Sequence, residues 1–346
     1  MNMDNPRQLS WTVRGKTEHE EKEEKTEKSQ IKCDMISNLS SDLMRYIFGF
    51  VKEQEMFSYR SVSKHFKANI TPSVVAVIDF EEKFYDWDFI PNVFKNLRVL
   101  ICRNLELTEI PNIAGLKVLD CSGNNLTRIP NIAGLSILKC SSNRLAEIPN
   151  IVGLSILICS CNRLLEVPNI VGLSILICLR NQLIEIPNIV GLKELDCSNN
   201  WLIQMPNIDG LSILKCSSNQ LTEIFNIVGL SILKCSYNYL TEIPNIVGLK
   251  ELDCSNNRLT QIPNIAGLSI LKCSSNQLTE IPNIVGLSIL ICSRNQLTEI
   301  PNIVGLKELD SSFNPLKKIP AMVCFEENED TFYEMPDIVG LETFYD

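Results

Sequence analysis

Histidine is almost absent from this sequence, whose 346 residues include only His19 and His65. Neither lies close in the sequence to the regularly spaced cysteines, so we expect neither a Cys–His nucleophile pair nor a zinc site that contains histidine. The sequence also lacks the phosphate-binding loop G-x-x-x-x-G-K-[ST] and a dinucleotide-binding fingerprint. These absences predict a protein that is not an enzyme and that holds no cofactor and no metal.

Basic clusters and long apolar runs are missing as well. The formal net charge is −9, and the repeated part of the chain has no cluster of Lys and Arg, whereas nucleic-acid binding needs a positive surface. No apolar run approaches the length that spans a bilayer, and Met1–Trp11 lacks the apolar core of a secretory signal. We therefore expect no nucleic-acid partner, no membrane partner, and a location in the cytoplasm or nucleus.

The sequence is dominated by one 19-residue pattern, L-x-x-L-x-C-x-x-N-x-L-x-x-I-P-N-I-x-G. A clear copy runs from Leu116 to Gly134, and the first Leu of the pattern occurs twelve times from Leu97 to Leu306. A fixed period near 20 residues with this core is typical of a solenoid. The pattern resembles the leucine-rich repeat, in particular the short Ile/Leu-Pro repeats of some bacterial effectors and of viral and protist proteins. The predicted fold class is an α/β repeat solenoid, a curved leucine-rich-repeat rod.

Each repeat is expected to form one short strand and one extended segment. The L-x-x-L-x-C part alternates inward and outward residues with the period of a strand, and successive strands should pair in parallel on the concave side. The I-P-N-I-x-G part is too short and too rich in Pro and Gly for a helix, so the convex side should be extended. The Asn at the ninth position, as in Asn124, should be buried and bond to backbone groups where the strand turns away.

Most of the 14 cysteines fall in one column of the repeats. Eleven of them, from Cys102 to Cys292, recur every 19 residues at a position that faces the core. Parallel strands about 4.8 Å apart hold such side chains parallel, whereas a disulfide needs Cβ atoms about 3.8 Å apart and turned toward each other. We interpret the column as reduced core thiols of an intracellular protein. A metal or redox role for the column is the less favoured alternative.

The composition changes outside the twelve repeats of residues 97–324. Residues 1–34 are polar and highly charged, which predicts a disordered tail. Residues 35–70 contain two amphipathic runs, which we expect to form short helices. Residues 71–96 end in a degenerate copy of the repeat and should cover the N-terminal end of the core, and residues 325–346 should form a C-terminal cap.

The helical segment at 35–70 resembles an F-box. Its apolar residues follow the spacing of that family without a gap from Leu39 to Phe66. It departs from the family at Ser40, at Ser63 and at Phe66, where Pro, Cys and Trp are usual. The resemblance implies docking on a Skp-family adaptor and, through it, on a cullin; the alternative is a helical cap that binds no adaptor. The residues that the resemblance assigns to adaptor binding are Leu39, Leu43, Ile47, Phe48, Val51, Val62 and Phe66.

The outward positions of the strands are the candidate surface for a protein target. One column is mostly Ile, and an exposed apolar stripe favours partner binding, although β-branched residues also simply suit a parallel sheet. A second column mixes Asp and Lys, and we expect Asp196–Lys215 and Asp253–Lys272 to pair across neighbouring strands. Aromatic residues interrupt small polar positions nearby, either as binding hot spots or through drift among duplicated copies. The candidate target-binding residues are Ile156, Ile175, Asp196, Trp201, Ile213, Lys215, Lys234, Tyr237, Tyr239 and Asp253.

Together these patterns predict a protein–protein interaction module. We expect a substrate receptor of an SCF-type cullin–RING ubiquitin ligase, in which the F-box-like segment docks the adaptor and the repeats hold a protein target whose identity the uniform repeats do not reveal. The alternative is a leucine-rich-repeat binding scaffold with no ubiquitin role. Binding of an adaptor separates these two hypotheses.

Overall fold

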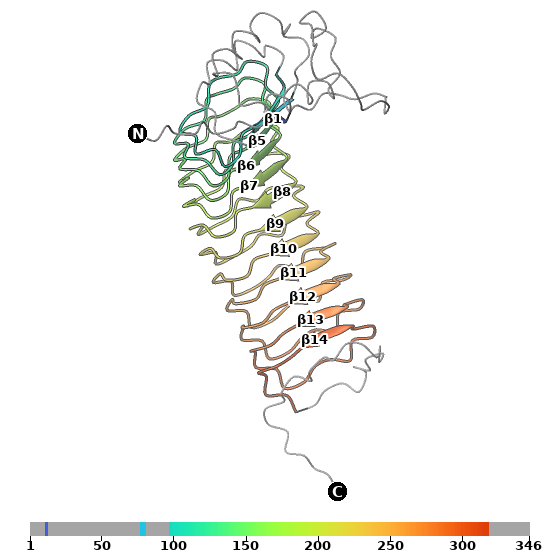
Figure 1. Cartoon of the computed structure of the whole chain (residues 1–346). Coiled ribbons are helices and arrows are strands. Elements are labelled where there is room, and N and C mark those ends of the chain that lie inside the picture. Colours follow the sequence, from blue (N-terminus) through green and yellow to red (C-terminus); the bar gives the residue numbers. More distant parts are fainter. Residues whose placement is uncertain (1–10, 13–76, 81–96, 318–346) are drawn as a thin grey trace, which may run out of the picture. The chain divides into compact units, whose positions relative to one another are not determined.

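The computed structural model of the chain describes residues 11–12, 77–80 and 97–317 (Figure 1). Contacts between residues divide the chain into two compact units, a first unit from Met1 to Leu164 and a second unit from Leu165 to Asp346. The F-box-like segment and the C-terminal cap predicted from the sequence lie outside the described residues. Within the described residues, no helix has the length and apolarity needed to cross a membrane.

The described part of the first unit is built from short strands, of which β1 and β2 precede the repeats and β3 to β6 belong one to each of the first four repeats. β1 pairs antiparallel with β2, and every later strand runs parallel to the strand before it. β1 lies within residues 1–34, the segment that we expected to be a disordered tail. The strands are β1 (Trp11–Thr12), β2 (Val77–Phe80), β3 (Val99–Ile101), β4 (Val118–Asp120), β5 (Ile137–Lys139) and β6 (Ile156–Ile158).

The second unit repeats one parallel strand every 19 residues. Each strand pairs with its successor in a register that matches residues 19 apart, such as Leu214 with Leu233, and Figure 1 shows the strands stacked in chain order. This unit is therefore a parallel-strand solenoid, as predicted. Its strands are β7 (Ile175–Ile177), β8 (Glu194–Asp196), β9 (Ile213–Lys215), β10 (Ile232–Lys234), β11 (Glu251–Asp253), β12 (Ile270–Lys272), β13 (Ile289–Ile291) and β14 (Glu308–Asp310).

The segments that join the strands are extended, as their Pro and Gly content predicts. No residue of 97–317 is helical. Each segment ends in a tight turn. In one of these turns, for example, the N–H of Leu192 donates to the carbonyl oxygen of Ile189 at 3.3 Å. Gly191, the third residue of this turn, has a φ of +90°, a conformation that favours glycine.

The core is made of the columns that the repeat pattern assigns inward. The middle residue of each strand from β3 to β13, such as Leu214, is fully buried, while its two strand neighbours are half-buried in most of these strands. The cysteines of the column, from Cys102 to Cys292, are fully buried free thiols. Burial raises the pKa of Cys159 to about 12, so the thiol form persists at neutral pH. This agrees with the interpretation of these residues as small apolar core side chains.

The ninth-position asparagines form the predicted ladder of backbone contacts. The side-chain oxygen of Asn219 accepts the N–H of Leu202 at 3.0 Å. Its amide nitrogen donates to the carbonyl oxygens of Cys197 at 3.1 Å and Cys216 at 3.0 Å. Each asparagine thus joins its own repeat to the preceding one at the point where the strand ends. At the start of the array Leu105 takes this position, and its N–H donates to Asn124.

Candidate protein-binding site

The outward Ile column of the second unit is half-buried rather than fully exposed. Ile213 and Ile232 lie in register on β9 and β10, and each covers part of its neighbour. Ile175, on β7, has the same half-buried environment. The expectation of an exposed apolar stripe therefore needs correction, because strands about 4.8 Å apart leave little open surface between β-branched side chains.

Two ion pairs border these isoleucines. Lys215 Nζ lies 3.9 Å from Glu194 Oε1, and Lys234 Nζ lies 2.9 Å from Glu251 Oε1. Lys215 on β9 therefore extends toward β8, and Lys234 on β10 extends toward β11. The two isoleucines and two lysines of β9 and β10 are consequently framed by acidic residues.

The predicted Asp–Lys pairs are not among the ion pairs of the described residues. Asp196 Oδ1 instead accepts the backbone N–H of Ser198 at 3.2 Å, and Asp253 Oδ1 accepts that of Ser255 at 3.1 Å. A short carboxylate that bonds to the residue two positions ahead is turned toward the end of its strand. The longer glutamate side chains remain free to reach across to the lysines.

The residue before each ladder asparagine has a left-handed backbone, which places Tyr237 in a strained conformation. Its φ is +56°, and the equivalent Asn199 and Asn256 have the same value. Asparagine adopts this region readily, whereas for tyrosine it costs of the order of 1 kcal/mol. The backbone is held there because the N–H of Tyr237 donates to the carbonyl oxygen of Ser255 at 2.9 Å. Its ring is 61% exposed.

Two further aromatic residues follow ladder asparagines, at what we call the exit edge of the strands. Trp201 and Tyr239 are about half exposed. The N–H of Trp201 donates to the carbonyl oxygen of Leu183 at 2.9 Å, which fixes its backbone against the preceding repeat. The guanidinium of Arg258 lies 4.6 Å from the centre of the Tyr239 ring. The structure thus places aromatic side chains on one edge, in two repeats that are separated by the repeat of Gln220.

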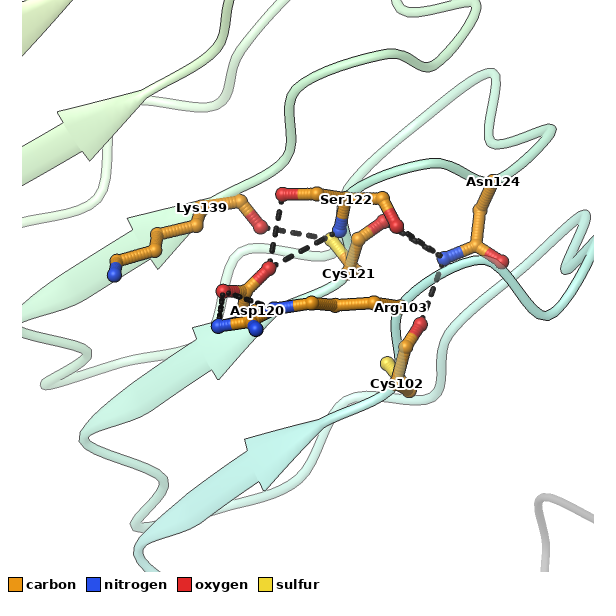
Figure 2. Close-up of polar contacts among 7 residues, drawn as sticks. All are labelled: Cys102, Arg103, Asp120, Cys121, Ser122, Asn124 and Lys139. Atoms are coloured by element: carbon orange, nitrogen blue, oxygen red, sulfur yellow. Dashed lines mark hydrogen bonds and ion pairs between the residues drawn. The ribbon is translucent and has the colours of Figure 1, made fainter. Parts of the chain in front are cut away.

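The first unit carries a different polar arrangement, shown in Figure 2. Asp120, the last residue of β4, is only 3% exposed. Arg103 donates to its Oδ2 from Nε at 2.8 Å and approaches it with a second nitrogen at 2.6 Å. The hydroxyl of Ser122 donates to Oδ1 at 2.9 Å. This carboxylate is fully engaged by its own unit, which makes it a structural rather than a ligand-binding group.

The candidate target residues therefore fall into two groups. Ile156 belongs to β6 of the first unit, whereas the other nine belong to the second unit. Within the second unit, Asp196 to Asp253 span β8 to β11 and the exit edge beside them. Among the described residues, no three His, Cys, Asp or Glu side chains gather as metal ligands would.

Sequence reasoning missed several exposed apolar side chains. Leu165, Ile184 and Ile203 occupy one position of three consecutive repeats and are more than half exposed. Phe225 replaces the proline of its repeat and is also exposed. The available signal was the departure from threonine, which fills the position of Ile203 in the next five repeats.

The comparisons with known proteins agree with this geometry. The family model of the Leucine Rich Repeat matches residues 115–135 and 248–268. The chain resembles solved structures of YopM from Yersinia enterocolitica, with 28% identity and a TM-score of 0.55 over 65% of this chain and 62% of that one. It also resembles the leucine-rich-repeat domain of APL1B, with 26% identity and a TM-score of 0.59 over 67% of this chain and 80% of that one. No curated protein sequence matches the chain.

A third similar structure shares the fold. The functional domain of InlJ from Listeria monocytogenes, which includes a cysteine ladder, shares 24% identity and a TM-score of 0.52 over 66% of each chain. The match to YopM spans less than two thirds of that protein's length. Two of the 19-residue units match the leucine-rich-repeat model, and the other units follow the same pattern in a parallel-strand solenoid similar to these structures.

Proposed function

We propose that the protein is a receptor that binds a partner protein through the second unit. The observation that carries this proposal is the group of exposed aromatic residues, Trp201, Tyr237 and Tyr239, on two repeats of the exit edge that are separated by one repeat. Tyrosine and tryptophan are the residues on which protein interfaces most often depend. The left-handed backbone of Tyr237 is shared by the equivalent residues of the other repeats, whereas the repeat fold does not require its exposed aromatic side chain.

The finer proposal is that this receptor serves an SCF-type cullin–RING ubiquitin ligase. It rests on the gap-free F-box spacing from Leu39 to Phe66. In this proposal the apolar residues of 35–70 dock a Skp-family adaptor, and a cullin joins through it. The repeats hold the target while other subunits of the ligase carry out the chemistry. The protein itself catalyses nothing, binds no nucleic acid and acts in the cytoplasm or nucleus.

Co-purification of a Skp-family adaptor tests the finer proposal. The full chain is compared with an Ile47→Asp/Phe48→Asp double variant, which places charge at two of the assigned apolar positions. Lys52→Asp is the matched control, because it changes charge in the same segment outside the assigned set. We expect the adaptor to accompany the wild type and the control, and to be lost from the double variant with the repeats still folded by circular dichroism.

The opposite results lead to the second candidate function. If the wild type captures no adaptor, the ligase role is wrong and the helical segment is only a cap. The protein then remains a binding scaffold, since the exit-edge aromatic residues do not depend on the adaptor. Equal capture by all three proteins would show that adaptor binding does not use the assigned apolar residues.

A further inference from the structure

An exposed apolar strip runs beside the aromatic residues of the second unit. Leu165, Ile184 and Ile203 are 54%, 57% and 62% exposed, and Trp201 is half exposed. In the next repeat these positions are polar, with Gln220 and Thr222, and threonine fills the position of Ile203 in the four repeats after that. The strip is therefore confined to three consecutive repeats, and the requirements of the repeat fold do not explain it. We call these four residues the exit strip.

Backbone hydrogen bonds between neighbouring repeats align the exit strip residues of one repeat with those of the next. The N–H of Trp201 donates to Leu183 at 2.9 Å, and the N–H of Gln220 donates to Leu202 at 2.8 Å. Leu183 and Leu202 are fully buried, so the residues on either side of each point outward in an extended chain. Ile184 and Ile203 consequently stand on adjacent repeats, about 5 Å apart.

Acidic residues lie beside the exit strip. Glu166 and Glu185 directly follow Leu165 and Ile184, and Glu223 follows in the repeat after Ile203. All three glutamates are exposed, and none has an ion-pair partner among the described residues. The corresponding stretches of three of these repeats, residues 182–191, 201–210 and 220–229, contain no Lys or Arg, whereas the equivalent stretch 163–172 begins with Arg163.

We propose that the exit strip docks a basic amphipathic segment of a partner protein. Its apolar side chains would cover Trp201, Ile184 and Ile203, and its Lys or Arg side chains would pair with the unpartnered glutamates. An acidic segment would be repelled, and a purely apolar one would leave the carboxylates unpaired. This inference rests on the proposed protein-binding function and adds to it the chemistry of the bound segment.

Fluorescence anisotropy with synthetic peptides tests the inference on the full chain. The probe is a labelled amphipathic peptide of Leu and Lys; one comparison peptide has Glu in place of Lys, and another is oligolysine. We expect the Leu/Lys peptide to bind, and both comparison peptides to bind at least about tenfold more weakly, because each lacks one of the two interactions. Equal binding of the Leu/Glu peptide or of oligolysine overturns the proposal, as does no binding of the Leu/Lys peptide.

Variants that borrow residues from other repeats locate the binding. Ile184→Thr/Trp201→Gln/Ile203→Thr introduces the residues of Gln220 and Thr222, so the repeat fold is preserved. We expect it to weaken binding of the Leu/Lys peptide by about tenfold or more. Gln277→Ala/Thr279→Ala, at the same positions of a distant repeat, is the control and should bind as the wild type does. Unchanged affinity in the triple variant overturns the proposal.

A charge variant tests the acidic half of the strip. Glu185→Gln/Glu223→Gln follows the example of Gln204, which occupies this position naturally. We expect weaker binding at low salt and a shallower decrease of affinity with added salt, because fewer charge pairs are screened. If the salt dependence of the peptide affinity is unchanged in this variant, the proposed pairing of the peptide's basic side chains with these glutamates is wrong. Adaptor capture is measured on the same variants, so that failure of the exit strip is distinguished from failure of the ligase proposal.

Discussion

In the second unit, the two edges of the stacked strands expose apolar residues in different ways. At the start edge, where the chain turns into each strand, valines precede the glycines in most repeats and are 72–85% exposed. At the exit edge, apolar residues are confined to a few repeats. The regular start edge reflects the turn that every repeat must make, whereas the irregular exit edge departs from the repeat. Departure from the repeat is therefore the better guide to a binding site.

Even the interruptions of the start edge follow a structural rule. Lys193 donates to the carbonyl oxygen of Gly210 at 3.2 Å, and Lys250 donates to that of Gly267 at 3.3 Å. In both turns the residue before the glycine is not valine but Asp209 or Ala266. The first unit repeats the correlation, since Ala133 precedes the Gly134 that Lys117 contacts. Nothing comparable accounts for Trp201 or Ile203 at the exit edge.

The largest expected effect concerns the ladder that separates the core from the exit edge. Asn219→Ala removes the partners of Leu202 N–H and of two buried carbonyl groups. We expect a loss of roughly 3 to 5 kcal/mol in the free energy of unfolding of this region. Urea denaturation measures the loss, and Gln220→Ala, at the exposed neighbouring position, should change stability by less than about 0.5 kcal/mol. Similar losses of stability in both variants would mean that the ladder asparagine contributes no more to stability than an exposed residue of the exit edge.

The second effect concerns the buried thiols and depends on pH. Burial, with a smaller contribution from Asp310, raises the pKa of Cys292 from 9.0 to about 12. The unfolded chain therefore releases this proton before the folded chain does, and stability that is complete below pH 9 is lost as the pH rises toward 12. The loss is about 1.4 kcal/mol per pH unit for each thiol.

Thermal unfolding between pH 8 and pH 10.5 measures this dependence. The Cys292→Ala variant should lose less stability over the range than the wild type, by the contribution of one thiol. Ser293→Ala, which changes the adjacent half-buried position, should keep the pH dependence of the wild type. An identical pH dependence in Cys292→Ala would show that this thiol ionises as freely in the folded chain as in the unfolded one.

The third effect has the opposite sign and concerns the exit edge. Tyr237→Asn places in the left-handed conformation the residue that positions 199 and 256 already carry. We expect a gain of about 1 kcal/mol in stability, because the strain of the tyrosine backbone is removed. Differential scanning calorimetry measures it, with Tyr239→Gln as the control at an ordinary backbone position. Loss of stability in Tyr237→Asn would mean that the ring contributes more through its contacts than the backbone strain takes away.

Sequence reasoning predicted what depends on the period and missed what depends on individual side chains. The parallel register, the extended connections and the Asn219 ladder follow from a pattern that every repeat shares. The pairing of Lys215 with Glu194 rather than Asp196 depends on the short reach of an aspartate that bonds to Ser198. In several repeats the residue before the ladder asparagine is Asn, Ser or Gly. This preference indicated a left-handed backbone at the equivalent Tyr237, but only the structure made that conformation evident.

The smallest expected effect concerns the contact that orients Tyr239 at the exit edge. Arg258 lies 4.6 Å from the centre of its ring, and such cation–π contacts contribute about 0.5 to 1 kcal/mol at exposed sites. A double-mutant cycle with Arg258→Gln and Tyr239→Gln isolates this contribution, since glutamine occupies the position of both residues in other repeats. We expect a coupling energy of about 0.5 kcal/mol. A coupling near zero would mean that Arg258 does not orient the ring of Tyr239 at the exit edge before a partner binds.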